Sequence, residues 1–150
     1  MEQTMIENQK EDGTELDNRF LIFEVARMFY SVELCYVLEI ITAQQPTRLP
    51  HLPEEIRGII NLRGKVIPVV DMRIKLGLDA TVYTDKTCIV VVEVDEMQVG
   101  LIVESVIEVI TVMPNQTAAT PADGTTPRFV GSVSNINSRA ILNVDCAKLF

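Results

Sequence analysis

The side chains that could act as nucleophiles or general bases are few and lie far apart in the sequence. The chain has one histidine, His51, and three cysteines, Cys35, Cys88 and Cys146. Nucleophilic catalysis needs a base beside the nucleophile and a third group that orients the base, and no local motif supplies such a set. We therefore predict an exposed loop histidine and three buried, unreactive thiols in a reducing compartment.

The acidic residues give no stronger indication of catalysis. Asp71 and Asp145 occur at predicted strand ends, where a turn-stabilising hydrogen bond explains them better than proton transfer. Asp95-Glu96 is predicted to be a hairpin tip, and the sequence has neither a CxxC pair nor a glycine-rich phosphate loop. We expect no enzyme activity, no metal and no cofactor. A small enzyme with a polar pocket around His51 stays open as an alternative.

Arg63 gives the clearest indication of binding chemistry. The stretch from Arg48 to Lys75 has six basic and three acidic residues, within a chain of net charge −8. A cationic surface on an acidic protein favours an acidic partner and disfavours nucleic acid and anionic membranes. A guanidinium group can bind a carboxylate through two hydrogen bonds. The alternatives are that Arg63 pairs within its own subdomain and that these charges are only solvated strand ends.

Short β-branched runs separated by turn residues must position these side chains, and they predict strands. The predicted strands lie at 20–25, 30–34, 36–41, 59–62, 66–70, 88–94, within 99–112 and, as a pair, within 129–150. Gly64 is expected to adopt positive φ in the turn after residue 62. Pro68 places its strand at a sheet edge or in a bulge. Glu54-Glu55 could begin a short helical turn, and 113–127 is predicted to be an exposed loop.

The composition limits the class of protein. With 150 residues, 47% of them apolar, the chain can form one domain of ordinary size. No segment is long and apolar enough to span a membrane, and the N-terminus lacks a secretory signal. Residues 1–19 are polar and acidic, so we expect a flexible tail. The composition predicts a soluble, intracellular protein.

An internal repeat organises the rest of the chain. Residues 37–41 (VLEII) match residues 106–110 (VIEVI) at an offset of 69, and residues 58–76 match 131–149 at an offset of 73 or 74. We therefore predict two barrel copies, at about 20–78 and 87–150, that exchange strands. The fold class is all-β, with two five-stranded barrels related by a pseudo-twofold axis around a shared hydrophobic core. In the second copy, Asn137 occupies the turn position that Arg63 has in the first. This difference suggests that the two copies have different binding tasks.

The segment PTRLPHLPEEIRGIINLRGKVIPVVDMRIKLG, residues 46–77, resembles the signature of the CheW-like family of bacterial chemotaxis coupling proteins. The resemblance covers residues 20–150. It implies two SH3-like barrels and a non-enzymatic adaptor that couples chemoreceptor signalling tips to the regulatory domain of a CheA-type histidine kinase. It also implies contacts with other CheW-like domains in array rings, and a cytoplasmic location with recruitment to membrane-associated chemoreceptor arrays.

The same resemblance implies two sets of binding residues. The receptor-binding set is Arg63, Val37, Glu39, Ile40, Gly58, Asn61, Leu62 and Cys88. The kinase-binding set is Pro46, Arg48, Leu49, Arg128 and Phe129. Since the 114–127 loop is poor in large and charged residues, an alternative stays open: a divergent CheW-like adaptor of a non-chemotaxis pathway that controls motility or gene regulation.

Overall fold

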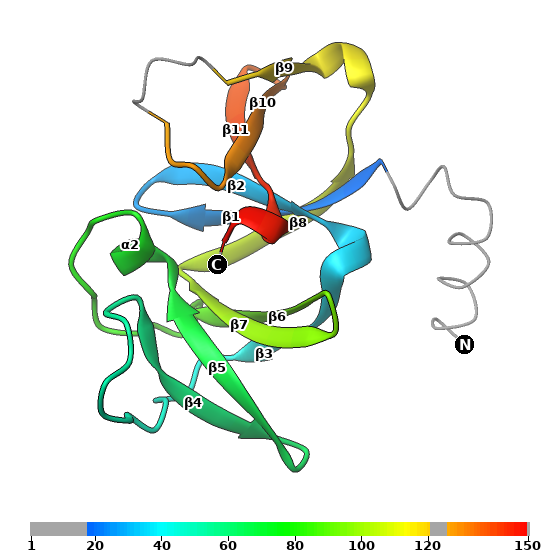
Figure 1. Ribbon diagram of the computed structural model, residues 1–150. Helices are drawn as coiled ribbons and strands as arrows, with labels where there is room; N and C mark the ends of the chain where they lie inside the picture. Colours follow the sequence, from blue (N-terminus) through cyan, green and yellow to red (C-terminus); the bar gives the residue numbers. More distant parts are fainter. Residues whose placement is uncertain (1–17, 121–125, 150) are drawn as a thin grey trace. The chain divides into compact units, whose positions relative to one another are not determined.

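The computed structural model describes residues 18–120 and 126–149. Its regular structure there is almost entirely β-sheet, which confirms the predicted all-β class (Figure 1). Five strands form one sheet in the order β3-β6-β7-β5-β4: β3 (Val37–Thr42), β4 (Ile56–Leu62), β5 (Lys65–Asp71), β6 (Cys88–Val94) and β7 (Met97–Val103). Six form another in the order β8-β1-β2-β11-β10-β9: β1 (Arg19–Val25), β2 (Met28–Glu33), β8 (Ser105–Thr111), β9 (Thr117–Ala119), β10 (Val130–Ile136) and β11 (Arg139–Val144). The other elements in these ranges are the helix α2 (Met72–Lys75) and the 3-10 turns η1 (Leu34–Tyr36), η2 (Pro114–Gln116) and η3 (Cys146–Lys148).

Backbone contacts divide the chain into two compact units. Among the described residues, one consists of residues 18–22, 29–36, 107–120 and 126–149, and the other of residues 23–28 and 37–106. The strands β1 and β8 each begin in one unit and end in the other, so the division follows no single point in the sequence. The proposed tail at 1–19 and the copies at 20–78 and 87–150 divide the chain by sequence similarity instead, and they stay a prediction.

The five-stranded sheet lies within the second unit and has an aliphatic core. Its buried cluster is Ile60, Ile67, Val69, Ile89, Val91 and Ile102, against which Ile41, Leu62 and Tyr83 pack. Alternating residues of β4 and β5 enter this core because side chains on a strand point to opposite faces in turn. The same alternation leaves the side chain of Val66 62% exposed, while Val69, three residues later on β5, is 0% exposed.

Pro68 was predicted to mark a sheet edge or a bulge. It marks no edge, but the pairing of β4 with β5 has an irregularity close to it, between Ile56 and Gly58 on β4. The strand β5 lies between β4 and β7. Ile59, the residue opposite Pro68, exchanges both of its backbone hydrogen bonds with Thr47, so Pro68 needs no N–H toward β4. On the other side, the parallel pairing of β5 with β7 begins only at Val69. The proline therefore occupies a position where neither neighbouring strand requires a donor, which sequence alone does not reveal.

The tight hairpin turns repeat between the sequence copies. Ala26-Arg27 and Asp95-Glu96 both have positive φ, and so do Arg63-Gly64 and Asn137-Ser138. Two consecutive residues with positive φ are typical of the type I′ turn, which suits the twist of a two-residue hairpin. The turns of the first pair lie 69 positions apart in the sequence and those of the second pair 74 positions apart, which are the offsets of the repeat. Gly64 has φ +83°, as predicted.

Asp71 and Asp145 stabilise equivalent turns at the ends of β5 and β11. Asp71 Oδ1 accepts a hydrogen bond from the backbone N–H of Arg73 at 2.9 Å, and Asp145 Oδ1 accepts one from Ala147 N–H at 3.1 Å. Each carboxylate caps the short helical turn that follows it. The predicted structural role of both residues is confirmed.

Two predictions of local structure were wrong. Glu54-Glu55 form a turn without helix. Within the predicted loop 113–127, the chain instead forms η2 and then β9, which pairs antiparallel with β10. This short strand gives the six-stranded sheet one strand more than expected. The predicted flexible tail lies, except for its last two residues, outside the described residues, as do residues 121–125.

A buried polar network distinguishes the six-stranded sheet. Asn143 on β11 accepts a hydrogen bond from Ser31 at 2.6 Å and donates to Ser132 and Ser134 at 2.9 Å each. At the repeat offset of 74, Asn143 corresponds to the core residue Val69. The duplicated sequences therefore fill equivalent strand positions with different chemistry, and the buried polar groups of this network all have partners.

Candidate binding surface

The β4–β5 hairpin presents Arg63 at its tip (Figure 1). Arg63 has φ +53°, and the following Gly64 donates its backbone N–H to Asn61 Oδ1 at 2.9 Å. The asparagine side chain thus closes the turn that holds Arg63, a local role that this residue type often has. Asn61 itself is exposed.

Arg63 makes a two-pronged contact with Glu39 on β3. Nη2 donates to Oε2 at 2.8 Å, and Nη1 donates to Oε1. The hydrogen bonds from Arg63 lower the pKa of the Glu39 carboxyl, and the carboxylate raises the pKa of Arg63. Since β3 and β4 are the two edges of the five-stranded sheet, this contact draws the edges together. In the free protein Arg63 therefore pairs within its own subdomain, which was one of the alternatives left open by the sequence.

An open depression of about 340 Å³ lies around this ion pair. Its lining residues are Leu38, Glu39, Leu62, Arg63, Lys65, Val91 and Gln98. The side chain of Arg63 is 74% exposed and that of Glu39 is 24% exposed, while the exposed fraction of Leu38 is 49%. The surface thus combines a cation, an anion and an accessible aliphatic side chain. Sequence reasoning missed four of these residues, because no local pattern joins them to Glu39 and Arg63: Leu38, Lys65, Val91 and Gln98.

The other predicted receptor-binding residues are more dispersed. Val37 is half-buried and pairs with Val92, whereas Cys88 pairs with Thr42 at the opposite end of β3. Ile40 is 42% exposed, but it does not line the depression around Arg63. The structure brings together Arg63, Glu39 and Leu62, and it does not bring Ile40 or Cys88 to the same depression.

Gly58 is buried and has a packing role. Its φ is +147°, and a Cβ atom there would lie 2.2 Å from the backbone oxygen of Thr47. The segment at Thr47 runs antiparallel beside β4 at this point, where Thr47 and Ile59 exchange backbone hydrogen bonds of 2.8 and 2.9 Å. Only glycine permits so close an approach of two backbones.

Comparison with known proteins shows the family. Residues 19–150 match the CheW-like domain. The chain belongs to the CheW-like family. Among its relatives, chemotaxis protein CheW of Rhizobium meliloti is 33% identical over 87% of this chain and 85% of that protein, and chemotaxis protein CheW of Klebsiella aerogenes is 28% identical over 91% and 84%.

A solved structure agrees with this assignment. The scaffolding protein TtCheW from Thermoanaerobacter tengcongensis matches with a TM-score of 0.79 and 31% sequence identity, over 85% of this chain and 88% of that chain. The likeness confirms the predicted fold class of this CheW-like chain, an all-β structure with two SH3-like subdomains.

The kinase-binding residues implied by the family lie in several environments. Arg48 and Leu49 are exposed on the loop before β4, and Pro46 is half-buried there. Arg128 is exposed, but Phe129 is only 4% exposed. The ring of Phe129 therefore belongs to the interior and not to an accessible surface, because the chain turns inward at the start of β10.

An arginine–glutamate pair in the second sequence copy was not predicted. Arg139 Nη2 donates to Glu108 Oε2 at 3.2 Å, and the guanidinium carbon lies 4.8 Å from the ring centre of Phe29. Glu108 is the repeat counterpart of Glu39, whereas Arg139 is the counterpart of Lys65 and not of Arg63. Both copies thus contain an arginine–glutamate pair, but only the first copy has its arginine at the hairpin turn.

The residues considered for catalysis remain apart in the described ranges. His51 is exposed in a loop, and no group of three His, Cys, Asp or Glu side chains there could hold a metal ion. Burial raises the pKa of the Cys146 thiol to about 12 and also raises that of Cys88. Cys35 is exposed and Cys88 is half-buried, so the prediction of three buried thiols was correct only for Cys146. Among residues 18–120 and 126–149, no helix has the length and apolar character needed to cross a bilayer.

Proposed function

We propose that this CheW-like protein is a scaffold of bacterial chemotaxis that couples chemoreceptor signalling tips to a CheA-type histidine kinase. Family membership carries the proposal: the match spans residues 19–150, and the similar solved protein is described as a scaffolding protein. These comparisons do not favour the alternative of a non-chemotaxis pathway. The CheW family acts as a non-catalytic scaffold, and we extend that description to this chain. We also propose a cytoplasmic location with recruitment to membrane-associated arrays.

The receptor contact is proposed to centre on Arg63. Two features support this assignment. The side chain of Arg63 is 74% exposed, and the pairing with Glu39 uses only part of the hydrogen-bonding capacity of its guanidinium group. An exposed ion pair contributes little to stability, so a receptor carboxylate can share or replace Glu39 at little cost. Leu38 and Leu62 provide aliphatic surface beside the charge.

Kinase contact is proposed at Arg48, Leu49 and Pro46 in one unit, and around Arg128 in the other. Since Phe129 is buried, we propose Arg128 without the neighbouring ring. Additional CheW-like domains in array rings are proposed as further partners. No role is proposed for nucleic acid, and no segment is proposed to insert into a membrane.

Arg63→Glu is expected to weaken receptor binding about ten- to hundredfold, because one charge-assisted contact contributes about 1.5–3 kcal/mol. The variant also places two carboxylates against each other at Glu39. Binding is measured by co-sedimentation with receptor signalling tips, and folding by circular dichroism.

Arg139→Glu is the matched control, since it makes the same charge change at the ion pair with Glu108. Its receptor affinity should stay within about threefold of that of the native protein, because a surface substitution away from the binding site usually has a small effect. Equal receptor affinity for Arg63→Glu and the native chain would contradict the assignment.

A further inference from the structure

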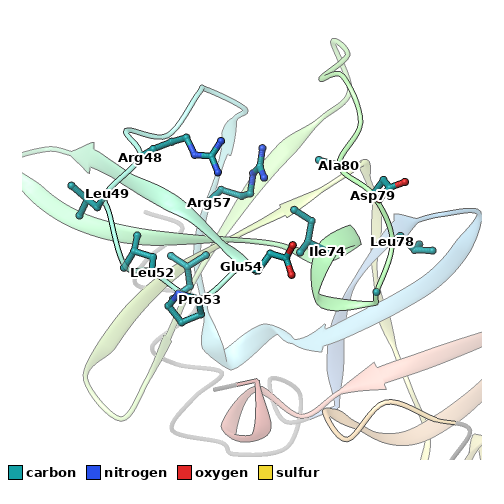
Figure 2. Close-up of a pocket in the computed structure, with 12 residues that line it drawn as sticks. Arg48, Leu49, Leu52, Pro53, Glu54, Arg57, Ile74, Leu78, Asp79 and Ala80 are labelled. Carbon is teal, nitrogen blue, oxygen red and sulfur yellow. The ribbon is translucent and has the colours of Figure 1, made fainter.

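A pocket of about 440 Å³ lies in the unit of residues 23–28 and 37–106, between the loop before β4 and the segment that follows α2 (Figure 2). Its lining residues are Arg48, Leu49, Leu52, Pro53, Glu54, Ile56, Arg57, Ile74, Gly77, Leu78, Asp79 and Ala80. None of these residues lines the depression around Arg63. The pocket is therefore separate from the proposed receptor contact.

Two arginines give one side of this pocket a positive charge. Figure 2 shows the guanidinium groups of Arg48 and Arg57 on the same side. Neither forms an ion pair with a carboxylate among the described residues. Two carboxylates also line the pocket, but Figure 2 shows that of Glu54 on the side of Ile74, and Asp79 on the opposite wall. Two neighbouring, unpaired guanidinium groups favour binding of a carboxylate.

Exposed leucines surround the charged side. Leu49, Leu52 and Leu78 are 45%, 36% and 40% exposed, and all three line the pocket. Exposed aliphatic side chains beside cations suit a partner that carries both an anion and an apolar group.

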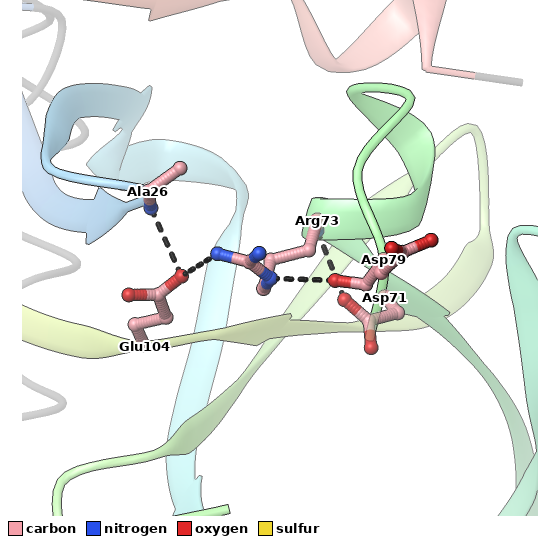
Figure 3. Close-up of polar contacts among 5 residues, drawn as sticks. All are labelled: Ala26, Asp71, Arg73, Asp79 and Glu104. Carbon is pink, nitrogen blue, oxygen red and sulfur yellow. Dashed lines mark hydrogen bonds and ion pairs between the residues drawn. The ribbon is translucent and has the colours of Figure 1, made fainter. Parts of the chain in front are cut away.

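The hydrogen bonds between Thr47 and Ile59 fix the wall that carries Arg48. A cluster around Arg73 fixes the opposite wall (Figure 3). Arg73 Nε donates to the backbone oxygen of Asp79 at 2.7 Å, and its Nη1 donates to Glu104 Oε2 at 2.8 Å. The same carboxylate oxygen accepts from Ala26 N–H at 2.9 Å. Anchored walls mean that a ligand need not order the pocket when it binds.

We propose that this pocket docks a segment of a partner protein in which acidic residues adjoin leucine-like residues. Carboxylates of the segment bind Arg48 and Arg57, and its aliphatic side chains pack against Leu49, Leu52 and Leu78. The inference deepens the proposed function, on which it rests for the identity of the partner, because Arg48 and Leu49 belong to the proposed kinase contact. It adds Arg57 and Leu78 to that contact and defines the chemistry of the segment that binds there.

The test uses the full chain labelled with ¹⁵N and two synthetic peptides, acetyl-Glu-Leu-Leu-Glu-Glu-amide and its counterpart with glutamine in place of glutamate. The acidic peptide should shift the amide signals of the pocket residues and bind at least about tenfold more tightly than the glutamine peptide. The double variant Arg48→Gln/Arg57→Gln should lose a similar factor. Arg139→Gln, which removes one positive charge at the ion pair with Glu108, outside both proposed binding surfaces, should bind the acidic peptide like the native chain.

The second arm measures the regulatory domain of the kinase against the same variants. Loss of its binding in the double variant, with receptor co-sedimentation unchanged, would support the docking proposal separately from the Arg63 assignment. The proposal is overturned if the two peptides bind equally or not at all, or if the shifts lie outside the pocket. It is also overturned if the native chain forms a dimer that the double variant cannot form, because the occupant would then be a second copy.

Discussion

Val69→Asp is expected to unfold the protein at 25 °C and neutral pH, whereas Val66→Asp on the same strand should remain folded. Val69 is 0% exposed within the aliphatic cluster, and Val66 is 62% exposed. Loss of the buried valine costs about 1.5–3 kcal/mol. Burial of the new carboxyl would raise its pKa, and each unit of that shift costs about 1.4 kcal/mol at neutral pH. The total approaches the 5–15 kcal/mol that typically stabilises a domain.

The pH dependence provides a second test of this variant. A carboxyl whose pKa is higher in the folded than in the unfolded state favours unfolding once it ionises. The stability deficit of Val69→Asp should therefore shrink as the pH falls from about 8 toward about 5, where the buried acid can stay neutral. Thermal unfolding followed by circular dichroism measures both effects. A melting temperature for Val69→Asp close to that of Val66→Asp would show that the core assignment is wrong.

Gly58→Ala is expected to destabilise the protein by about 2–6 kcal/mol, from backbone strain and overpacking of about 1–3 kcal/mol each. The added Cβ would lie 2.2 Å from the backbone oxygen of Thr47, at a φ of +147° that alanine rarely adopts. The bridge between Thr47 and Ile59 should open, because the clash involves backbone that cannot simply rotate away.

Gly64→Ala separates the two causes. Gly64 also has positive φ, +83°, but nothing lies within 4 Å of an added Cβ. It should lose only about 1 kcal/mol, the cost of the conformation itself. Chemical denaturation of both variants measures the difference, and amide exchange at Thr47 and Ile59 reports on the bridge. Equal destabilisation of the two variants would contradict the packing role of Gly58.

The repeat in the sequence predicted much of the fold. Type I′ turns recur at Arg63-Gly64 and Asn137-Ser138, and the capping aspartates recur at Asp71 and Asp145. These features depend on a few neighbouring residues, so a local pattern specifies them. Residues that contact distant segments were harder to interpret. Pro68 suggested an edge strand or a bulge, but it lies in an inner strand whose neighbours on both sides require no donor at that position.

The candidate site was only partly predictable for the same reason. Arg63 and Glu39 could be named from the family resemblance, but their direct pairing depends on the closure of the sheet. Gly58 resembled a binding residue, yet its position against Thr47 explains it by packing. The pairing of Arg139 with Glu108 was missed because the repeat places asparagine, not arginine, at the second turn.

The exposure of single residues was the least predictable property. Cys35 lies among apolar neighbours in the sequence, yet it occurs in the turn η1, where its side chain is exposed. Phe129 adjoins exposed Arg128 but is buried as the chain enters β10. Apolar neighbours in sequence do not fix burial at the end of a strand, because the direction of the chain decides which side chains face inward.

Reconstitution with receptor membranes and kinase tests the central claim most directly. Membranes that contain the chemoreceptor are mixed with a CheA-type kinase, with and without this protein, and the kinase in the pellet is quantified. The proposed function predicts that the kinase sediments with the membranes mainly when the native protein is present, and that Arg63→Glu abolishes most of this gain. The same amount of pelleted kinase with and without the protein would contradict its role as a coupling scaffold.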